Sequence, residues 1–227
     1  YYDGKPYNGT TIQLKNAARE IAALHKVLDK VKIKYSYRTD INLYYKVITR
    51  KELDQINKQI NKKSTKDDFD SQLKKDMTFL LNILRKHEEN GKKAFRVKYK
   101  MQLIHRDIHP DNMIFEKNNV AAIIDFVGMR KSRLIEDIAF ACFRLSAYKT
   151  RDINLVQRRV KIFIDTYTKY NHISEDEILY LNYFFIHEML SKLGYILRKR
   201  YFQSYNLWDI DYNMIIEHLR IAEKISH

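Results

Sequence analysis

The chain has 227 residues, of which 45% are hydrophobic and 31% are charged, and its formal net charge is +14. This balance indicates a globular protein and excludes a disordered one, and no apolar run approaches the roughly 18 residues that span a bilayer. The single cysteine, Cys142, cannot form an internal disulfide, so we expect a cytoplasmic protein without a membrane partner.

The positive charge does not indicate a nucleic-acid partner. The 42 Lys and Arg residues are spread along the whole chain, without an arginine-rich arm, a zinc-finger spacing or an aromatic RNA-binding signature. We interpret these residues as solvated helix faces and predict that the protein binds no nucleic acid.

The chain opens with a loop and a helix. Gly4, Pro6 and Gly9 predict a loop over the first ten residues. Apolar residues then recur with a 3.6-residue period and predict a helix over residues 12–29. His25 lies close to the apolar face of this helix, so we expect it to be packed and hydrogen-bonded rather than to bind a ligand.

A connection and a second helix follow. Residues 30–47 are rich in Tyr and Lys and indicate an irregular connection. Ser64 and Thr65 form capping-box-like pairs with acidic residues three positions on, which predict a long helix over about residues 66–89. Gly91 is well placed to end this helix.

Short β-prone runs replace this pattern at residues 101–105, 112–116 and 120–126. Asn118 and Asn119 lie between the last two runs and favour a hairpin, because Asn tolerates a positive φ. After Gly128 the helical period returns and predicts helices over residues 134–147, 152–171, 175–200 (capped by Ser174, with Glu177 at the third helical position) and 211–225.

We therefore predict a mostly helical α+β fold with a small β hairpin island, in a single domain over residues 1–227. Residues 1–100 would form its helical first part with the connection, and residues 101–128 would form the island. Residues 129–227 would form the C-terminal helices.

Three oxygen-bearing side chains lie at the ends of the predicted strands. Asp107 follows the first strand, Asn112 begins the second, and Asp125 lies near the end of the third. Because the hairpin turns the chain back on itself, Asp125 can face the loop that contains Asp107. Carboxylate and amide oxygens suit Mg²⁺, and phosphoryl transfer needs such a metal and a carboxylate that accepts a hydroxyl proton. Asn112 and Asp125 suit the metal, and Asp107 suits the base.

The segments "HRDIHPDN" (105–112) and "IIDF" (123–126) resemble the catalytic core of the protein-kinase-like superfamily. More closely, they resemble the aminoglycoside phosphotransferase and choline/homoserine kinase-like family, whose members often read HGD-L-H-P-x-N and then IDF or IDW. "DIAFA" (137–141) resembles the segment after the metal aspartate, and residues 3–25 resemble the first large-lobe helix. The resemblance runs from residue 3 to about 145 and concerns the large C-terminal lobe only.

The resemblance implies a kinase that moves the γ-phosphate of ATP, bound with Mg²⁺, to a hydroxyl group of a small molecule such as an aminoglycoside, choline or homoserine. By position, Asp107 would be the catalytic base and His105 a buried, hydrogen-bonding support of the loop. Asn112 and Asp125 would bind the metal and the nucleotide.

The other polar residues near the motif are expected to have structural roles. We expect His109 and Pro110 to shape the loop and Asp111 to lie at the surface. Asp137 is expected to cap a helix or anchor a loop rather than to bind a ligand.

The small lobe of the family, with its phosphate-covering loop and its Lys–Glu ion pair, comes before the segment that matches residues 3–25. The chain contains no strand–glycine loop–strand and no lysine in such a strand, and it begins with Tyr1 rather than Met. We therefore expect the large lobe alone, with the small lobe either upstream or naturally lost.

Two other interpretations remain open. His105, Asp107 and His109 alternate, and on a strand they would line one face and suit a metal-dependent hydrolase. A catalytically inactive kinase-like scaffold would fit the lack of a small lobe, although Asp107, Asn112 and Asp125 are all retained.

The acceptor site of this family lies against the C-terminal helices, here residues 152–225. Aromatic rings beside carboxylates could hold a cationic amine there, although rings at helical spacing also suit a core. The residues concerned are Tyr183, Phe184, Phe185, Tyr195, Tyr201, Tyr205, Trp208, Glu188, Asp209 and Asp211.

Overall fold

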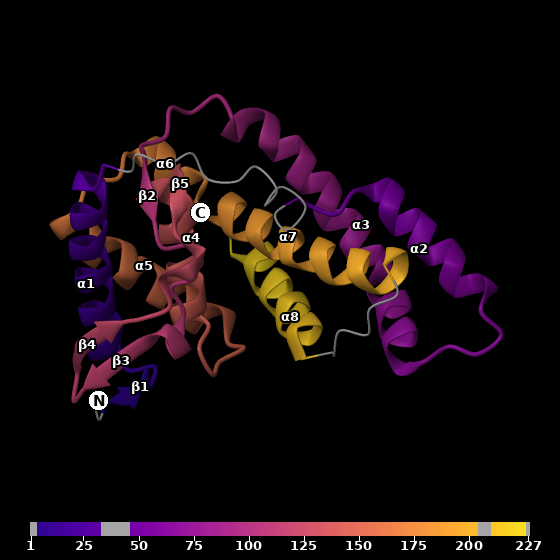
Figure 1. The fold of residues 1–227 in the computed structure, drawn as a ribbon, viewed down its shortest axis with the longest axis horizontal. Helices are drawn as coiled ribbons and strands as arrows, with labels where there is room; N and C mark the ends of the chain where they lie inside the picture. Colours follow the sequence, from indigo (N-terminus) through magenta and orange to yellow (C-terminus); the bar gives the residue numbers. More distant parts are fainter. Residues whose placement is uncertain (1–3, 33–45, 204–209, 226–227) are drawn as a thin grey trace. The chain divides into compact units, whose positions relative to one another are not determined.

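The computed structural model describes residues 4–32, 46–203 and 210–225 (Figure 1). Residues 33–45 of the predicted connection lie outside this part of the chain. Contacts group the chain into two compact units. The first unit comprises Tyr1–Tyr37, Val97–Phe185 and Lys224–His227, and the second comprises Arg38–Arg96 and Ile186–Glu223. The single domain stays a prediction.

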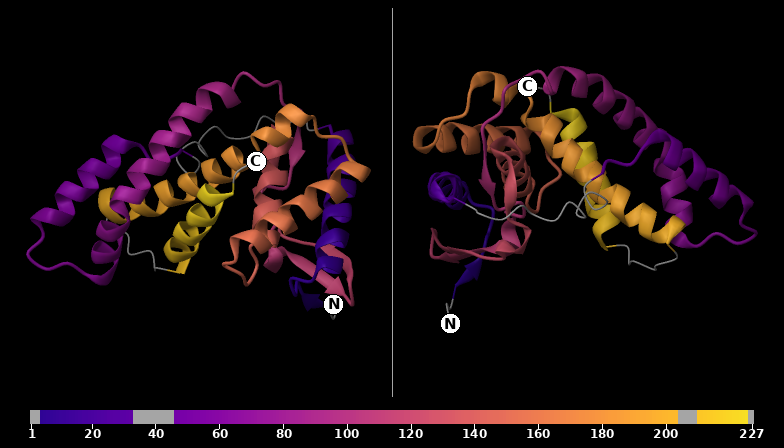
Figure 2. Two further views of the ribbon diagram at one scale, coloured as in Figure 1. Left: turned by 180° about the vertical axis from the view of Figure 1, so that it is seen from behind. Right: turned by 45° about the horizontal axis from the view of Figure 1, so that its top comes forward.

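The first unit contains α1 (Thr11–Lys30), α4 (Leu134–Ser146), α5 (Ile153–Tyr170) and α6 (Glu175–Leu179). α1 begins after Thr10, whose side chain accepts a hydrogen bond from a backbone N–H of the first turn. The buried apolar face of α1 packs against α5 and α4 (Figures 1 and 2). This element confirms the first predicted helix.

Two small sheets also belong to the first unit. β1 (Lys5–Pro6), β3 (Met113–Glu116) and β4 (Asn119–Ile123) form an antiparallel sheet in the order β1-β3-β4. β2 (Met101–Ile104) instead pairs in antiparallel fashion with β5 (Arg130–Arg133). The sequence predicted no strand at β5, because three of its four residues are Lys or Arg.

The second unit contains α2 (Arg50–Lys62), α3 (Asp68–Ala94) and most of α7 (Leu181–Phe202) and α8 (Ile210–Lys224). The helix predicted over residues 175–200 is interrupted at Tyr180, which separates α6 from α7. Ser174 and Glu177 form a capping box at the start of α6, as predicted, and Tyr180 caps its end.

The ends of α3 correct two predictions. Its N-cap is Asp67, whose carboxylate accepts a hydrogen bond from a backbone N–H of the first turn, rather than Ser64 or Thr65. Gly91 does not end the helix but lies buried inside it, and its carbonyl accepts a hydrogen bond from the N–H of Phe95. Gly in a helix costs about 1 kcal/mol relative to Ala, so local burial overrides this penalty.

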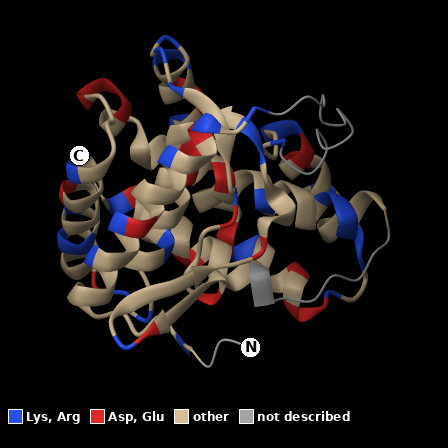
Figure 3. Ribbon diagram, turned by 60° about the vertical axis from the view of Figure 1, so that its left-hand side comes forward, with Lys and Arg blue, Asp and Glu red and all other residues tan. Residues whose placement is uncertain are grey.

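Charged residues of both signs are interspersed along the helices, with Lys and Arg in blue and Asp and Glu in red in Figure 3. Some of these cations belong to exposed ion pairs within one helix, such as Lys161 with Asp165 at 2.8 Å. Among the helices of the described ranges, none is long and apolar enough to cross a membrane.

Candidate active site

A buried carboxylate from α4 holds the start of the loop between β2 and β3. Asp137 is 1% exposed, and its two oxygens accept hydrogen bonds from the backbone N–H groups of His105 and Arg106, each at 2.8 Å. Arg106 has a φ of 79°, a conformation that is unfavourable for residues other than Gly, Asn and Asp. The structure confirms the predicted role of Asp137 as a loop anchor.

A chain of hydrogen bonds links this anchor to α1 and α5. The Nε2 atom of His25 lies 3.1 Å from Asp137 Oδ2, and its Nδ1 atom lies 2.7 Å from the hydroxyl of Tyr167. Burial opposes ionisation of Asp137, but the hydrogen bonds from His25 and the two loop amides hold the pKa of its carboxyl below the ordinary value. His25 is fully buried, as predicted for a packed, hydrogen-bonded histidine.

His105 is the buried residue that joins the loop to the end of β4. Its Nδ1 atom accepts a hydrogen bond from the backbone N–H of Asp107 at 3.3 Å, so the hydrogen of the neutral ring is on Nε2. Nε2 then donates to the carbonyl of Ile124 at 3.0 Å. The ring packs beside Phe126 with a centroid distance of 4.5 Å.

Asp107 and Asn112 contact each other across the loop. Asn112 Nδ2 donates to the backbone carbonyl of Asp107 at 2.9 Å and lies 3.5 Å from its carboxylate atom Oδ2. Asn112 is 8% exposed, whereas the carboxylate of Asp107 is partly exposed. The predicted base is therefore accessible, and the amide beside it is held in one orientation.

The peptide of Ile124 brings Asp125 to the same loop. Its N–H donates to the carbonyl of Asn112 at 3.0 Å, and its carbonyl accepts the hydrogen bond from His105. Asp125, the next residue, has φ and ψ of 65° and its side chain makes no cap hydrogen bond to the short 3₁₀ helix that follows. Backbone contacts of Ile124 thus bring the three predicted residues to one loop region.

The side-chain oxygens of this region are suitable ligands for a hard cation. Asp125 is exposed, and together with the amide of Asn112 it offers only oxygen ligands, which Mg²⁺ prefers. In the described parts of the chain, no three His, Cys, Asp or Glu side chains are grouped so as to hold a metal ion. A metal bound here would therefore use one carboxylate, one amide and groups from a ligand or water.

The geometry does not support the alternating metal site of a hydrolase. β2 ends at Ile104, so His105, Asp107 and His109 do not lie on a strand face. Both ring nitrogens of His105 are engaged by backbone groups, at 3.0 and 3.3 Å. This ring has no nitrogen lone pair to offer a metal while these contacts persist.

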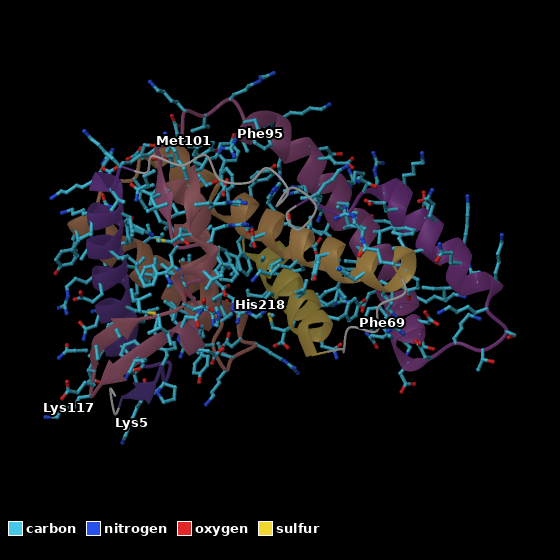
Figure 4. All side chains as sticks on the ribbon, viewed as in Figure 1. Lys5, Phe69, Phe95, Met101, Lys117 and His218 are labelled. Atoms are coloured by element: carbon cyan, nitrogen blue, oxygen red, sulfur yellow. The ribbon has the colours of Figure 1, made fainter. Side chains whose placement is uncertain are left out.

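The hairpin that carries Asn112 and Asp125 is held at its turn by α1. Gln13, which is 1% exposed, donates to the carbonyl of Lys117 at 2.8 Å, and Asn16 donates to the carbonyl of Asn118 at 2.8 Å. Figure 4 labels Lys117 at this turn. These contacts were not predicted from the sequence. The available signal was Gln13, a polar residue within the apolar face of the first helix.

Three of the five described aromatic residues considered for the acceptor are core residues. Phe185 is fully buried and stacks on Phe143 at 4.5 Å, while Tyr183 and Phe184 are 8% and 3% exposed. Tyr201 in the second unit donates to Asp70 at 2.7 Å. Tyr205, Trp208 and Asp209 lie outside the described residues, as does the side chain of Asp211.

Comparison with known proteins relates the chain to phosphotransferases. The sequence model described as "Phosphotransferase enzyme family" matches residues 3–172. No sequence among the curated proteins matches the chain. The solved structures that are similar in fold at low sequence identity include three of whose length the chain spans 63–66%.

An aminoglycoside phosphotransferase from Alicyclobacillus acidocaldarius is 16% identical, with a TM-score of 0.65 over 99% of this chain and 66% of that one. An ethanolamine kinase from Plasmodium vivax is 18% identical, with a TM-score of 0.62 over 98% of this chain and 63% of that one. An amicoumacin kinase solved with AMP-PNP and Ca²⁺ is 12% identical, with a TM-score of 0.61 over 100% of this chain and 64% of that one.

Proposed function

The chain belongs to the phosphotransferase enzyme family, and from this premise we propose that it forms the large lobe of a small-molecule kinase. The reaction is transfer of the γ-phosphate of ATP to a hydroxyl group of a small molecule in the cytoplasm. The acceptor would be an aminoglycoside, choline, homoserine or a similar compound, and the small lobe would lie in the remaining part of the complete protein.

One observation carries this proposal. The peptide of Ile124 is hydrogen-bonded on one side to His105 and on the other to Asn112. This arrangement brings Asp125 to the loop in which Asn112 contacts Asp107. An amide and two carboxylates in one loop region are the groups that phosphoryl transfer requires.

The surroundings of each side chain suggest its role in the reaction. Asp107, partly exposed, would orient the acceptor hydroxyl and accept its proton as the new phosphorus–oxygen bond forms. Asn112 and Asp125 would hold Mg²⁺, which when bound supplies positive charge that neutralises the phosphates. His105 would keep Ile124, and through it Asp125, next to the loop.

The test is phosphate transfer by the complete protein that contains this chain, with ATP, Mg²⁺ and a panel of kanamycin, choline, ethanolamine and homoserine. We expect a phosphorylated product with at least one acceptor, and its loss together with weaker Mg·ATP binding in Asp125→Ala. Asp165→Ala, an exposed carboxylate on α5, is the matched control and should leave transfer unchanged.

Two results would contradict the proposal. Nucleotide binding without transfer to any acceptor would favour the inactive scaffold. Stoichiometric zinc with hydrolysis of a substrate would favour the hydrolase.

A further inference from the structure

We infer that His109 is a positioning residue for Asp107, to whose carboxylate it presents its Nε2–H group. The inference deepens the proposed function and rests on it. His109 was expected only to shape the loop, and its ring lies between two carboxylates, those of Asp107 and Asp111.

The hydrogen-bond pattern selects the tautomer of His109. Its Nδ1 atom accepts a hydrogen bond from the backbone N–H of Asp111 at 3.3 Å, which makes His109 the N-cap of the 3₁₀ helix Pro110–Asn112. Because Nδ1 accepts this hydrogen bond, a ring that carries one hydrogen carries it on Nε2. Nε2 is the ring atom that faces Asp107, 3.5 Å from Oδ2.

The same carboxylate oxygen has a second donor beside it. Asn112 Nδ2 also lies 3.5 Å from Asp107 Oδ2, so amide and imidazole approach one oxygen from two residues of the loop. Two donors at one oxygen fix the rotation of a carboxylate better than one donor can. Both distances are long for hydrogen bonds, and contacts of this kind in active sites without ligand often shorten once substrate binds.

Burial makes the contact more effective. The side chain of His109 is 17% exposed, compared with 36% for Asp107 and 78% for Asp111. A partly buried donor is less screened by water than an exposed one, so it orients its acceptor more strongly. Asp111 is at the surface, as the sequence predicted.

A pure capping role is the alternative, and two variants separate the roles. In His109→Asn the amide oxygen can replace Nδ1 as the cap acceptor, but the shorter side chain brings no donor from position 109 to Asp107. In His109→Gln the amide nitrogen can replace Nε2 as the donor, but the cap is weakened. If His109 acts only as a cap, His109→Asn should preserve phosphate transfer better than His109→Gln. If His109 positions Asp107, His109→Gln should preserve it better.

The first measurement is independent of activity. Long-range ¹H–¹⁵N correlation spectra of the complete protein, assigned with His109→Gln, should show the His109 ring hydrogen on Nε2. Asp111→Asn, which removes the carboxylate 3.4 Å from Nδ1, should leave that tautomer unchanged. A ring hydrogen on Nδ1 would overturn the inference and leave the proposed function standing.

The second measurement is steady-state phosphate transfer with the best acceptor of the panel. We expect His109→Asn to lower kcat by about tenfold to a hundredfold with an unchanged KM for ATP, as misorientation of a reacting group does, and His109→Gln to restore most of kcat. His172→Asn, an exposed histidine outside the loop, is the control. An unchanged kcat in His109→Asn would overturn the inference, whereas a wild type without transfer would overturn both the function and the inference.

Discussion

Asp137 accepts hydrogen bonds from two successive backbone amides, those of His105 and Arg106, and also contacts His25. These partners keep its carboxyl ionised in spite of complete burial, because they hold its pKa below the ordinary value. A charged acceptor is what allows Arg106 to remain at a positive φ. The geometry of the loop therefore depends on a residue 30 positions beyond Asp107 in the chain.

We expect Asp137→Asn to lower the free energy of unfolding by about 2–3 kcal/mol, because an amide NH₂ would face a backbone N–H without an acceptor. Urea denaturation measures this loss. Asp165→Asn, on the exposed surface of α5, should change stability by no more than about 0.5 kcal/mol. Equal stabilities of the two variants would contradict the anchor role.

The candidate residues of the site could be found from the sequence because their types and spacing form a joint pattern. Asp107, Asn112 and Asp125 are all polar residues at predicted strand ends, and the structure places them in one loop region. The positive φ of Arg106 could not be predicted, since arginine gives no signal for it. The ring tautomers likewise depend on backbone donors that only the folded loop supplies.

Among the secondary-structure elements, the predictions were correct where an apolar pattern extends over many residues and wrong where it covers only a few. α1 and α5 have extended apolar faces and were predicted nearly to their ends. α2 was missed, although a capping box of Thr49 and Glu52 begins it, because only three of its 13 residues are buried. β5 was missed because its pairing with β2, rather than its own residues, makes it a strand.

The packing of α3 against α7 in the second unit contains a pair of histidines. His87 is 8% exposed, and its Nε2 atom lies 3.2 Å from His187 Nδ1. Burial, and then the neighbouring His187, lower the pKa of His87 to about 3. His87 is therefore neutral in the folded protein at pH 7.

This low pKa predicts acid sensitivity of the second unit. The folded state resists protonation of His87 down to about pH 3, whereas the unfolded chain takes up the proton near pH 6.5. Stability is therefore complete above pH 6.5 and falls by up to about 1.4 kcal/mol per pH unit as the pH drops towards 3.

Hydrogen exchange of the α3 amides at several pH values measures this slope. We expect His87→Gln to make it shallower, while the exposed His172→Gln keeps the wild-type slope. The same slope in wild type and His87→Gln would show that another group is responsible.

For the whole molecule, the family could be predicted from the sequence because the polar residues of two short segments have the spacing of the family's motifs. The match over residues 3–172 confirms that prediction, and the similar structures confirm a mostly helical fold of this class. The division into two compact units was not predicted, since it depends on contacts between residues far apart in the chain. The acceptor could not be identified, because three of the five described aromatic residues proposed for it are core residues.

The proposed function depends on Asp107 acting as the base of a phosphate transfer, and one comparison tests this role directly. In the complete protein, kcat for transfer and the Kd for Mg·ATP are measured for wild type and Asp107→Asn. We predict that kcat falls by at least about a hundredfold while Kd is nearly unchanged, because a base acts on the transferred proton and not on the bound nucleotide. An unchanged kcat in Asp107→Asn would contradict this role of Asp107.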